Sequence, residues 1–600
     1  MDPGTALAVT SLTFQVFAGC IRGFVLLSTA QNLGSDASLL RTQLGLEEWH
    51  FMQWAEKVGL IGKDGKLEGR GIEEMDPRIN EKLALKLMFE LEALLGRDKI
   101  RSRYKMDLVV ERPAEAVVDG KEDEGCEREG ARGVLGGIIS NDVRGEILAR
   151  VKLIQSKNHL PKRLWWAAVD RSKFEALVRD VRAIVQGLWA LLNPIQQEDL
   201  QNRIESILSV VIRVSEDVRD LRELGDVLRR NDGAEMSKTV GFAEAAELKA
   251  VGIEISSKEL GVGWSDAQIT RRHGILPTKD RTAKVLRPLQ IEKLTGVQPH
   301  QKNKSIGIGY YDHKPVFVET KTVEPFLRSK LKDRVDNLAI LLSTSKDASF
   351  HTLQCLGVIE IPNESQFVFV YDYPNLDILE DKTNLPQPIS LLELLNGSQP
   401  SVTYRLNLAT ALLRTINIFH TGGWLHKDLR SENILFFPTS STSHPLSSNL
   451  TPYLTGFQFS RLDNRTEISE NPSSNPSHDI YRHRNALGEP SMAFEQYMDI
   501  YSLGTILIEI AEWRPLRHVV LKHVDVKSGG VPLDKLAGIG KWLNETKVES
   551  GMVAFRMGDA FARAVKKCLG SGDGEGEGSQ VEDGHLDTLG TIHELSKCII

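Results

Sequence analysis

Two polar side chains in one short segment have the residue types and the spacing needed for chemistry. Asp428 stands five residues before Asn433, His426 stands two residues before the aspartate, and aliphatic residues flank the segment on both sides. A carboxylate can accept a proton, and a carboxamide oxygen can bind a hard cation such as Mg²⁺. The alternative interpretation is a polar loop between two buried segments, with no part in catalysis.

The stretch from Gly423 to Leu435 resembles the catalytic loop of protein kinases, whose pattern is H-x-D-L-x-x-x-N-[IV]-L. The resemblance implies that Asp428 is the catalytic residue that accepts the proton of the attacking hydroxyl. It also implies that Asn433 binds the cofactor by holding a magnesium ion on the phosphates of ATP.

A second metal ligand expected of a kinase is missing. Kinases carry a D-F-G motif downstream of the loop, and its Asp binds magnesium. The matching stretch is Tyr453 to Arg461, where Gly456 replaces that Asp and Gln458 replaces the second glycine. Glycine has no side chain to ligate a metal, so magnesium would depend mainly on Asn433. We therefore expect phosphotransfer to lose orders of magnitude in rate, which favours a pseudokinase.

The phosphate-binding elements upstream are partly recognisable. Pro315 to Lys321 alternates like a half-buried strand and resembles the V-A-I-K strand of kinases, so Lys321 is the candidate for pairing the α- and β-phosphates. A solvated lysine at a strand end is the alternative. The glycine-rich loop is reduced to Ser305 to Gly309, and Phe367 to Pro374 predicts the strand that leads into the hinge beside an adenine ring.

Two more elements fit a kinase-like lobe. Asp499 to Ile510 resembles the D-x-[YW]-S-x-G helix, whose Asp hydrogen-bonds the backbone of the His-x-Asp turn. Apolar residues at helical spacing predict a helix over 404–420. The A-P-E element of kinases is not recognisable.

Composition indicates a large protein of several domains. The 600 residues suggest about three or four domains. A formal net charge of -7 argues against general nucleic-acid binding. The five cysteines lie far apart without a C-x-x-C pair, so we expect no zinc site or disulfide framework and a cytoplasmic, reducing location. Two acidic, glycine-rich stretches, 117–137 and 571–584, predict disorder.

The first residues combine an apolar helix with two polar side chains. No signal peptide is evident, and the apolar stretch from Ala6 to Ala30 contains Gln15 and Arg22, which argues against a transmembrane helix. In a folded bundle this would be a core helix. After release, it would enter a bilayer only with both polar groups sheltered, which an oligomer allows.

The rest of the first 230 residues is expected to be almost wholly helical. Gly59 predicts the end of a long aromatic-rich helix, and a further helix closes at Asn193-Pro194. The last helix shows a coiled-coil-like seam of apolar residues at alternating spacings of three and four, which predicts the core of a helical bundle: Ile204, Ile207, Val211, Val214, Val218 and Leu221.

The N-terminal helix, the segment Trp54 to Leu60 and the block Trp165 to Phe174 together resemble the HeLo domain of fungal prion-inhibition and propagation proteins, over residues 1–230. The resemblance implies a helical bundle that triggers programmed cell death, as in fungal heterokaryon incompatibility, by releasing its N-terminal helix into a membrane. Chains that join HeLo to a kinase-like domain are similar in architecture, although the amyloid-forming tail motif of the family is not visible here.

The predicted fold class is therefore multidomain, with an all-α HeLo-like bundle followed by an α+β, bilobal protein-kinase-like fold. The expected divisions are the bundle at 1–230 with its insertion at 117–137, a linker at 231–300, an N-lobe at 301–374 and a C-lobe at 375–600.

These features predict a signalling protein whose effector bundle is joined to a degenerate kinase-like domain. Binding of ATP stays open, with weakened binding of Mg²⁺. Two alternatives also stay open: an active, atypical Ser/Thr kinase that uses Lys321, Asp428 and Asn433 with one metal ion, and a non-enzymatic scaffold. We expect a protein partner, no nucleic acid, and membrane recruitment through the N-terminal helix in a homo-oligomer.

Overall fold

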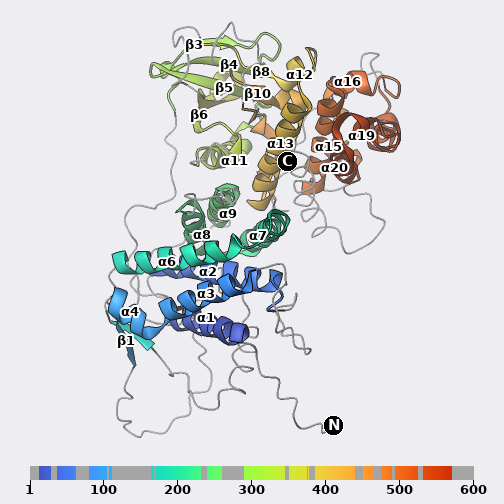
Figure 1. Ribbon diagram of the computed structural model, residues 1–600. Helices are drawn as coiled ribbons and strands as arrows, with labels where there is room; N and C mark the ends of the chain where they lie inside the picture. Colours follow the sequence, from blue (N-terminus) through green and yellow to red (C-terminus); the bar gives the residue numbers. More distant parts are fainter. Residues whose placement is uncertain are drawn as a thin grey trace, which may run out of the picture. The chain divides into compact units, whose positions relative to one another are not determined.

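The computed structural model describes residues 12–28, 37–61, 80–104, 107–110, 164–167, 171–230, 240–259, 289–344, 350–374, 376, 385–438, 451–463, 475–488, 493–524 and 531–570 (Figure 1). The chain forms two compact units, Met1–Val211 with Arg219–Ala234 and Ile212–Val218 with Glu235–Ile600. The predicted acidic stretches 117–137 and 571–584 lie outside the described residues, as does the start of the N-terminal segment.

The first unit is built mainly from helices: α1 (Leu12–Ser28), α2 (Ala37–Lys57), α3 (Glu81–Leu95), α4 (Arg97–Tyr104), α6 (Arg171–Trp189), α7 (Pro194–Val214) and α8 (Val218–Arg230). Helix α1 packs on α2 and α3, and α6 packs on α2 and α3. The core is aromatic, with the Phe51 ring centroid 5.4 Å from that of Phe17 and 6.0 Å from that of Phe24. The predicted helical character of this region is confirmed.

Turn chemistry explains where two of these helices meet loops. Helix α2 ends before Gly59, which has φ of +85°, and the N–H of Leu60 donates to the carbonyl oxygen of Ala55. At the start of α7, Asn193 and Gln196 each accept a hydrogen bond from the other's backbone N–H. Both boundaries follow the sequence prediction.

Two predictions for this region are wrong in detail. Leu164–Ala167 is a strand, β2, which pairs antiparallel with β1 (Asp107–Val110) instead of joining a helix. The predicted seam is also interrupted, because the helix ends at Val214, whose side chain is 69% exposed, and α8 begins only at Val218. The buried stripe of α7 repeats every four residues instead: Leu200, Ile204, Leu208 and Ile212.

The second unit contains a five-stranded antiparallel sheet in the order β3-β4-β5-β7-β6. Its strands are β3 (Leu294–Pro299), β4 (Ile306–Tyr311), β5 (Lys314–Thr322), β6 (Cys355–Ile361) and β7 (Gln366–Asp372), and helix α11 (Arg328–Leu342) packs on β6. The predicted strand at 315–321 is confirmed as β5. Because side chains alternate along a strand, Val316 and Val318 join the apolar core on one face, while Phe317, Glu319 and Lys321 share the other.

The remainder of this unit is mostly helical and includes short strand pairs. The described elements include α13 (Val402–Thr421), β9 (Trp424–Leu425), β10 (Ile434–Phe436), β11 (Tyr453–Leu454), β12 (Arg461–Leu462), α14 (Pro476–Asp479), α15 (Gln496–Glu512), α19 (Met552–Met557) and α20 (Asp559–Leu569). Helix α13 confirms the predicted helix over 404–420. Strands β9 and β12 pair with each other, as do β10 and β11.

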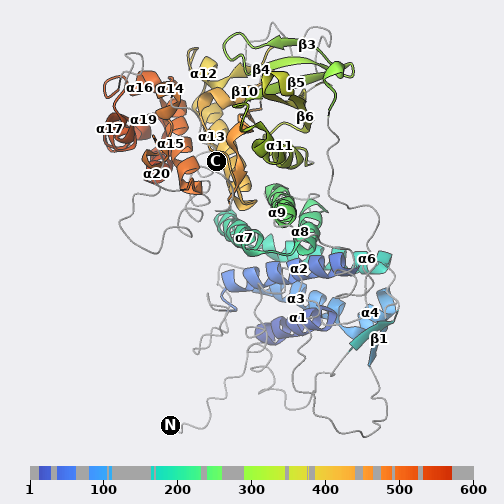
Figure 2. The same ribbon diagram turned by 180° about the vertical axis from the view of Figure 1, so that it is seen from behind.

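Helix α9 (Val240–Glu259) also belongs to the second unit, where it contacts α13 and α11 (Figure 2). It lies within the segment 231–300 that the sequence predicted as a linker. Its alanines and larger apolar residues are buried on most sides, and a helix that is apolar around its circumference belongs to a core. Among the helices described, none combines the length and apolarity needed to cross a membrane.

Candidate functional site

Two strand pairs bring together segments that are distant in sequence. The loop 426–433 follows β9 and leads into β10, whereas the segment 455–460 connects β11 to β12. Because β9 pairs with β12 and β10 pairs with β11, the loop and the segment lie side by side. The antiparallel pairing therefore brings both predicted functional stretches to one place.

The buried carboxylate of Asp499, on α15, fixes the start of the loop. It accepts hydrogen bonds from the backbone N–H of His426 at 2.8 Å and of Lys427 at 2.9 Å. The same carboxylate also hydrogen-bonds to Nε2 of the His420 ring at 3.2 Å. Burial raises the pKa of Asp499, but the hydrogen bond and charge of His420 outweigh it, so the pKa lies below its ordinary value. The backbone hydrogen bonds implied for Asp499 are thus present.

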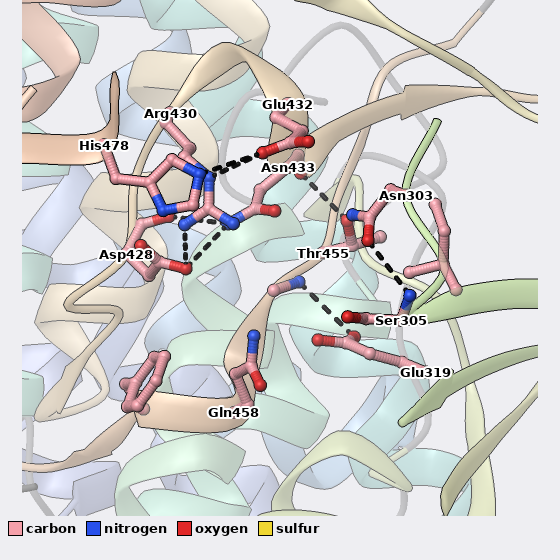
Figure 3. Close-up of a pocket in the computed structure, with 13 residues that line it drawn as sticks. Asn303, Ser305, Glu319, Asp428, Arg430, Glu432, Asn433, Thr455, Gln458 and His478 are labelled. Carbon is pink, nitrogen blue, oxygen red and sulfur yellow. Dashed lines mark hydrogen bonds and ion pairs between the residues drawn. The ribbon is translucent and has the colours of Figure 1, made fainter. Parts of the chain in front are cut away.

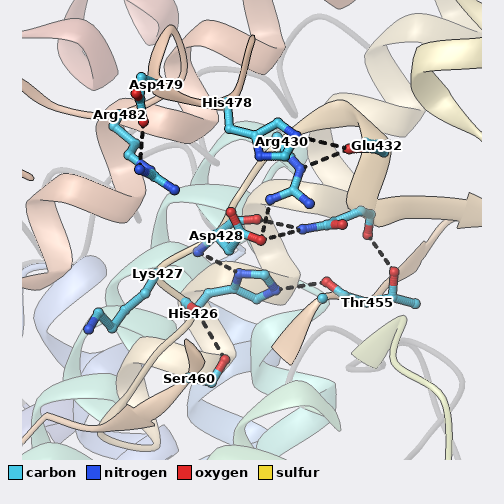
Figure 4. Close-up of polar contacts among 12 residues, drawn as sticks. His426, Lys427, Asp428, Arg430, Glu432, Thr455, Ser460, His478, Asp479 and Arg482 are labelled. Atoms are coloured by element: carbon cyan, nitrogen blue, oxygen red, sulfur yellow. Dashed lines mark hydrogen bonds and ion pairs between the residues drawn. The ribbon is translucent and has the colours of Figure 1, made fainter. Parts of the chain in front are cut away.

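The ring of His426 ties the loop to the neighbouring segment (Figure 4). Its Nε2 donates to the carbonyl oxygen of Thr455 at 3.0 Å, and its Nδ1 accepts from the backbone N–H of Asp428 at 3.3 Å. Burial lowers the pKa of His426, so the ring stays neutral in this tautomer. The ring also packs on Phe457, with centroids 4.8 Å apart.

The side chains of Asp428 and Asn433 lie in contact. The Asn433 side-chain amide donates to the backbone oxygen of Asp428 at 2.8 Å and to its carboxylate at 3.1 Å. Arg430 forms an ion pair with the same carboxylate, and both side chains are nearly buried. The Asp428 carboxylate is therefore paired with a cation from its own loop.

That ion pair continues into a short charged chain. The Nε of Arg430 contacts the Glu432 carboxylate at 3.1 Å, and the His478 ring contacts the same carboxylate at 3.5 Å. Hydrogen bonding to His478, together with the positive charge of Arg430, lowers the pKa of Glu432 to about 2. Arg430 thus forms ion pairs with both acidic side chains of the loop, Asp428 and Glu432.

Gly456 leaves no room for a side chain. Its φ of +80° lies in the left-handed region, and a Cβ built there would stand 2.4 Å from Cγ of Asn433. The position where a kinase would carry a metal-binding Asp therefore holds backbone alone, pressed against the Asn433 amide.

Glu319 faces this backbone from strand β5. Its carboxylate accepts a hydrogen bond from the N–H of Gly456 at 3.4 Å, and its side chain is only 3% exposed. Burial raises the pKa of Glu319 to about 7. Burial and the neighbouring Glu319 carboxylate also raise the pKa of the Tyr371 hydroxyl, which hydrogen-bonds to that carboxylate.

Two cationic side chains hold the rest of the segment by its carbonyl groups. Lys321 Nζ donates to Gln458 O at 2.6 Å and lies 5.3 Å from the centroid of the Phe459 ring. Arg334, on α11, donates to Phe459 O at 2.7 Å and to Ser460 O at 3.2 Å. Together with Glu319, they hold the backbone of 456–460 in place.

These groups surround a cavity of about 270 Å³ (Figure 3). The lining residues are Asn303, Ser305, Ile306, Glu319, Asp428, Arg430, Glu432, Asn433, Thr455, Gly456, Gln458, Phe459 and His478. Asp428 and Asn433 are thus at the cavity, as is Ser305 from the predicted glycine-rich stretch. Lys321 is not among the lining residues. No cluster of His, Cys, Asp and Glu able to hold a metal ion occurs within the described part of the chain.

Aromatic side chains fill the interior beside the predicted hinge. The Phe317 ring packs edge-on against Phe437 at 5.5 Å, and Tyr373 packs edge-on against the same ring at 5.3 Å. The Tyr371 ring lies 5.9 Å from Phe317. The hinge residues 371–374 do not line the cavity.

Three features of the site were not predicted from the sequence: Glu319, Arg334 and the pair Arg430–Glu432. A signal for Glu319 was available, because alternation in β5 places it on the same face as Lys321. Arg334 could not have been found in this way, since its partners Phe459 and Ser460 are more than a hundred residues downstream.

Comparison with known families adds evidence for the first unit. Residues 4–224 match the HeLo family model, described as prion-inhibition and propagation. This match supports the HeLo resemblance and suggests a signalling role of the cell-death or incompatibility type. No curated protein sequence matches the chain significantly.

Proposed function

We propose that this chain is a signalling effector of the cell-death type, in which the HeLo-like bundle acts and a kinase-like second unit regulates it without phosphotransfer. The family match over residues 4–224 supports the first part. The second part rests on the residues around the cavity.

Several features support a kinase-like architecture for the second unit. They are an antiparallel sheet with one helix packed on it, a loop with Asp428 and Asn433 in contact, and a helix whose Asp499 holds that loop by its backbone. In protein kinases the corresponding loop carries the base and a metal ligand. The proposed function departs from phosphotransfer because Glu319 and Gly456 lie beside this loop.

The hydrogen bond between Gly456 and Glu319 is the observation that carries the proposal. Strand β5 places Glu319 at the cavity and turns Lys321 to the carbonyl oxygen of Gln458, so a carboxyl group lines the cavity and the lysine proposed to pair the phosphates does not. The ionised form of the Glu319 carboxyl repels phosphates, its neutral form supplies no positive charge to attract them, and Gly456 offers no ligand for the metal ion that would neutralise them. Both changes oppose stabilisation of a transferring phosphoryl group.

The segment 456–460 beside the cavity is held in place by side chains of the protein. In an active kinase, metal ions bridge the nucleotide phosphates and the D-F-G Asp. Here Glu319, Lys321 and Arg334 grip the segment 456–460 directly. The proposed role of the second unit is therefore that of a closed, non-catalytic regulator, for which neither ATP nor Mg²⁺ is required.

Nucleotide titration with a phosphotransfer assay tests this proposal. We expect millimolar ATP, with or without Mg²⁺, to leave the melting temperature of the full chain unchanged. Binding at a hundredfold excess over Kd would add about 2.7 kcal/mol and raise it measurably. Label transfer should stay at background in the wild type and in Asp428→Ala. Robust transfer that Asp428→Ala abolishes would establish the active, atypical kinase instead.

That second candidate function is favoured by one observation, the contact of 3.1 Å between the Asn433 amide and the Asp428 carboxylate. An arrangement of base and metal ligand is compatible with single-metal chemistry, provided that Arg430 moves off the carboxylate. The label-transfer assay above distinguishes the two functions.

The effector role is tested separately by growth of a eukaryotic host that expresses the chain. We expect loss of viability when the chain is forced to oligomerise through a fused dimerising tag. The Asp428→Ala variant should retain this effect, whereas deletion of residues 4–224 should remove it. A toxic variant that lacks residues 4–224 would exclude the bundle as the effector.

A further inference from the structure

Helix α9 is the element that follows the bundle in sequence, yet it packs in the second unit. It contacts both α13 and α11. Phe242, Ala246, Leu248 and Ile255 are among its buried residues. Helix α9 therefore contacts elements that position the candidate site.

One contact is at the end of α13, immediately before the loop. Gly422 caps this helix, and a Cβ built on it would stand only 2.7 Å from Cβ of Leu248 and 3.4 Å from the carbonyl oxygen of Ala245. The backbone of α9 therefore approaches α13 as closely as a glycine permits. The contact is through a Cβ and a main-chain oxygen, so a side chain at 422 could be accommodated only by moving the helix.

A second contact is with the strand pair β9–β12. Gly252 of α9 lies so close that a Cβ there would stand 2.8 Å from Cδ2 of Leu462 and 3.6 Å from Nε1 of Trp424. Trp424 and Leu462 are paired residues of the two strands. One turn of α9 thus covers both strands at once.

Those two strands lead directly into the functional segments. Residues 426–428 follow β9 without interruption, and 456–460 immediately precede β12. The segments are tied together as well, because the Ser460 hydroxyl donates to the backbone oxygen of His426 at 3.0 Å. Arg334, which grips Ser460, lies on α11, the other helix that α9 contacts.

We propose that α9 is an intramolecular regulatory helix, whose docking on β9–β12 and α11 holds residues 426–428 and 456–460 in their observed arrangement. Undocking of α9 frees both segments, and a partner that rearranges them weakens the docking of α9 by the same free energy. This coupling depends on packing contacts alone and holds whether or not the site transfers phosphate.

Hydrogen exchange of the full chain, read by mass spectrometry, tests this coupling. In Gly252→Leu the new side chain collides with Leu462 and Trp424, although leucine favours the helix itself over glycine. We expect amides in 424–428 and 456–462 to exchange about tenfold faster, while β5–β7 keep their protection. Glu254→Leu, at a half-buried position on the other side of the same helix, is the matched control and should exchange like the wild type in both segments.

A second variant removes contact area without adding bulk. Leu248→Ala is expected to speed exchange in the same two segments, because it loosens the contact of α9 with Gly422. Faster exchange confined to α9 itself, with both segments unchanged, would overturn the proposal. So would loss of protection throughout β5–β7 in both variants, since α9 would then belong to the folding core instead of acting as a regulator.

Discussion

The carboxylate of Glu319 accepts a hydrogen bond from the backbone N–H of Gly456 across 3.4 Å, and the two residues are 137 positions apart in the chain. This contact places an acidic side chain against a residue that has no side chain, at the position where the kinase resemblance implies a metal-binding aspartate. The proposed loss of phosphotransfer depends on this pair more than on either residue alone.

The buried carboxyl of Glu319 makes stability depend on pH. Its folded pKa of about 7 exceeds the ordinary value of 4.5, so between these two values the folded state holds a proton that the unfolded chain has released. The free energy of unfolding of the second unit should therefore fall as pH rises from 4.5 to 7, by on the order of 3 kcal/mol.

Glu319→Gln removes this titration while keeping the shape of the side chain. We expect its urea unfolding midpoint to vary less between pH 5 and pH 8 than that of the wild type. Some dependence remains, because burial also raises the pKa of Glu509 to about 7. The control is Glu364→Gln, at an exposed residue, which should follow the wild-type curve. Identical pH profiles for Glu319→Gln and wild type would contradict the assignment.

Gly456 and Gly551 form a matched pair for measuring the crowding at the site. Their φ values are +80° and +78°, but a Cβ at 551 would have nothing within 4 Å, whereas one at 456 would meet Asn433. Gly551→Ala should cost about 1 kcal/mol for the left-handed backbone. Gly456→Ala should cost at least about 2 kcal/mol more, because Asn433 must move. Equal shifts in the urea midpoint would show that Asn433 yields freely.

Asp499 should be the most sensitive position among the residues that hold the loop. Asp499→Ala leaves the buried N–H groups of His426 and Lys427 without an acceptor, at about 1–3 kcal/mol each. We expect a loss of about 3 kcal/mol or more in the free energy of unfolding. Asp499→Asn retains one acceptor oxygen and should lose clearly less. A comparable loss in both variants would assign the effect to charge instead of hydrogen bonding.

The packing of α1 allows its release to be tested without deleting it. A Cβ at Gly23 would stand 2.4 Å from Cβ of Leu95 on α3, so Gly23→Leu should displace the helix. We expect the full-length variant to release dye from anionic liposomes, with further deletion of residues 1–30 abolishing the release. The control is Gly187→Ala, whose Cβ would meet Leu87 at an ordinary 3.4 Å. Leakage that persists after the deletion would exclude this helix as the membrane-active element.

The sequence by itself determined the local features of this protein. The amphipathic or wholly apolar helices and the strand 315–321 follow from spacing, because residues in one repeating element have few geometries available. The hydrogen bonds of Asp499 to the loop backbone were expected from the kinase resemblance of its segment. The Gly456 substitution was also visible in the sequence, since it is a departure within a short pattern.

Only the tertiary structure decided which charges meet at the cavity. It placed Glu319 on Gly456, turned Lys321 to Gln458, and brought Arg334 to Phe459 and Ser460, in each case across more than a hundred residues. It also placed helix α9, which lies within the segment expected to be a linker, in the second unit. Side-chain periodicity determines which face of a helix or strand a residue occupies. The partner on that face depends on how elements distant in sequence pack together, and this packing cannot be read from the pattern of one segment.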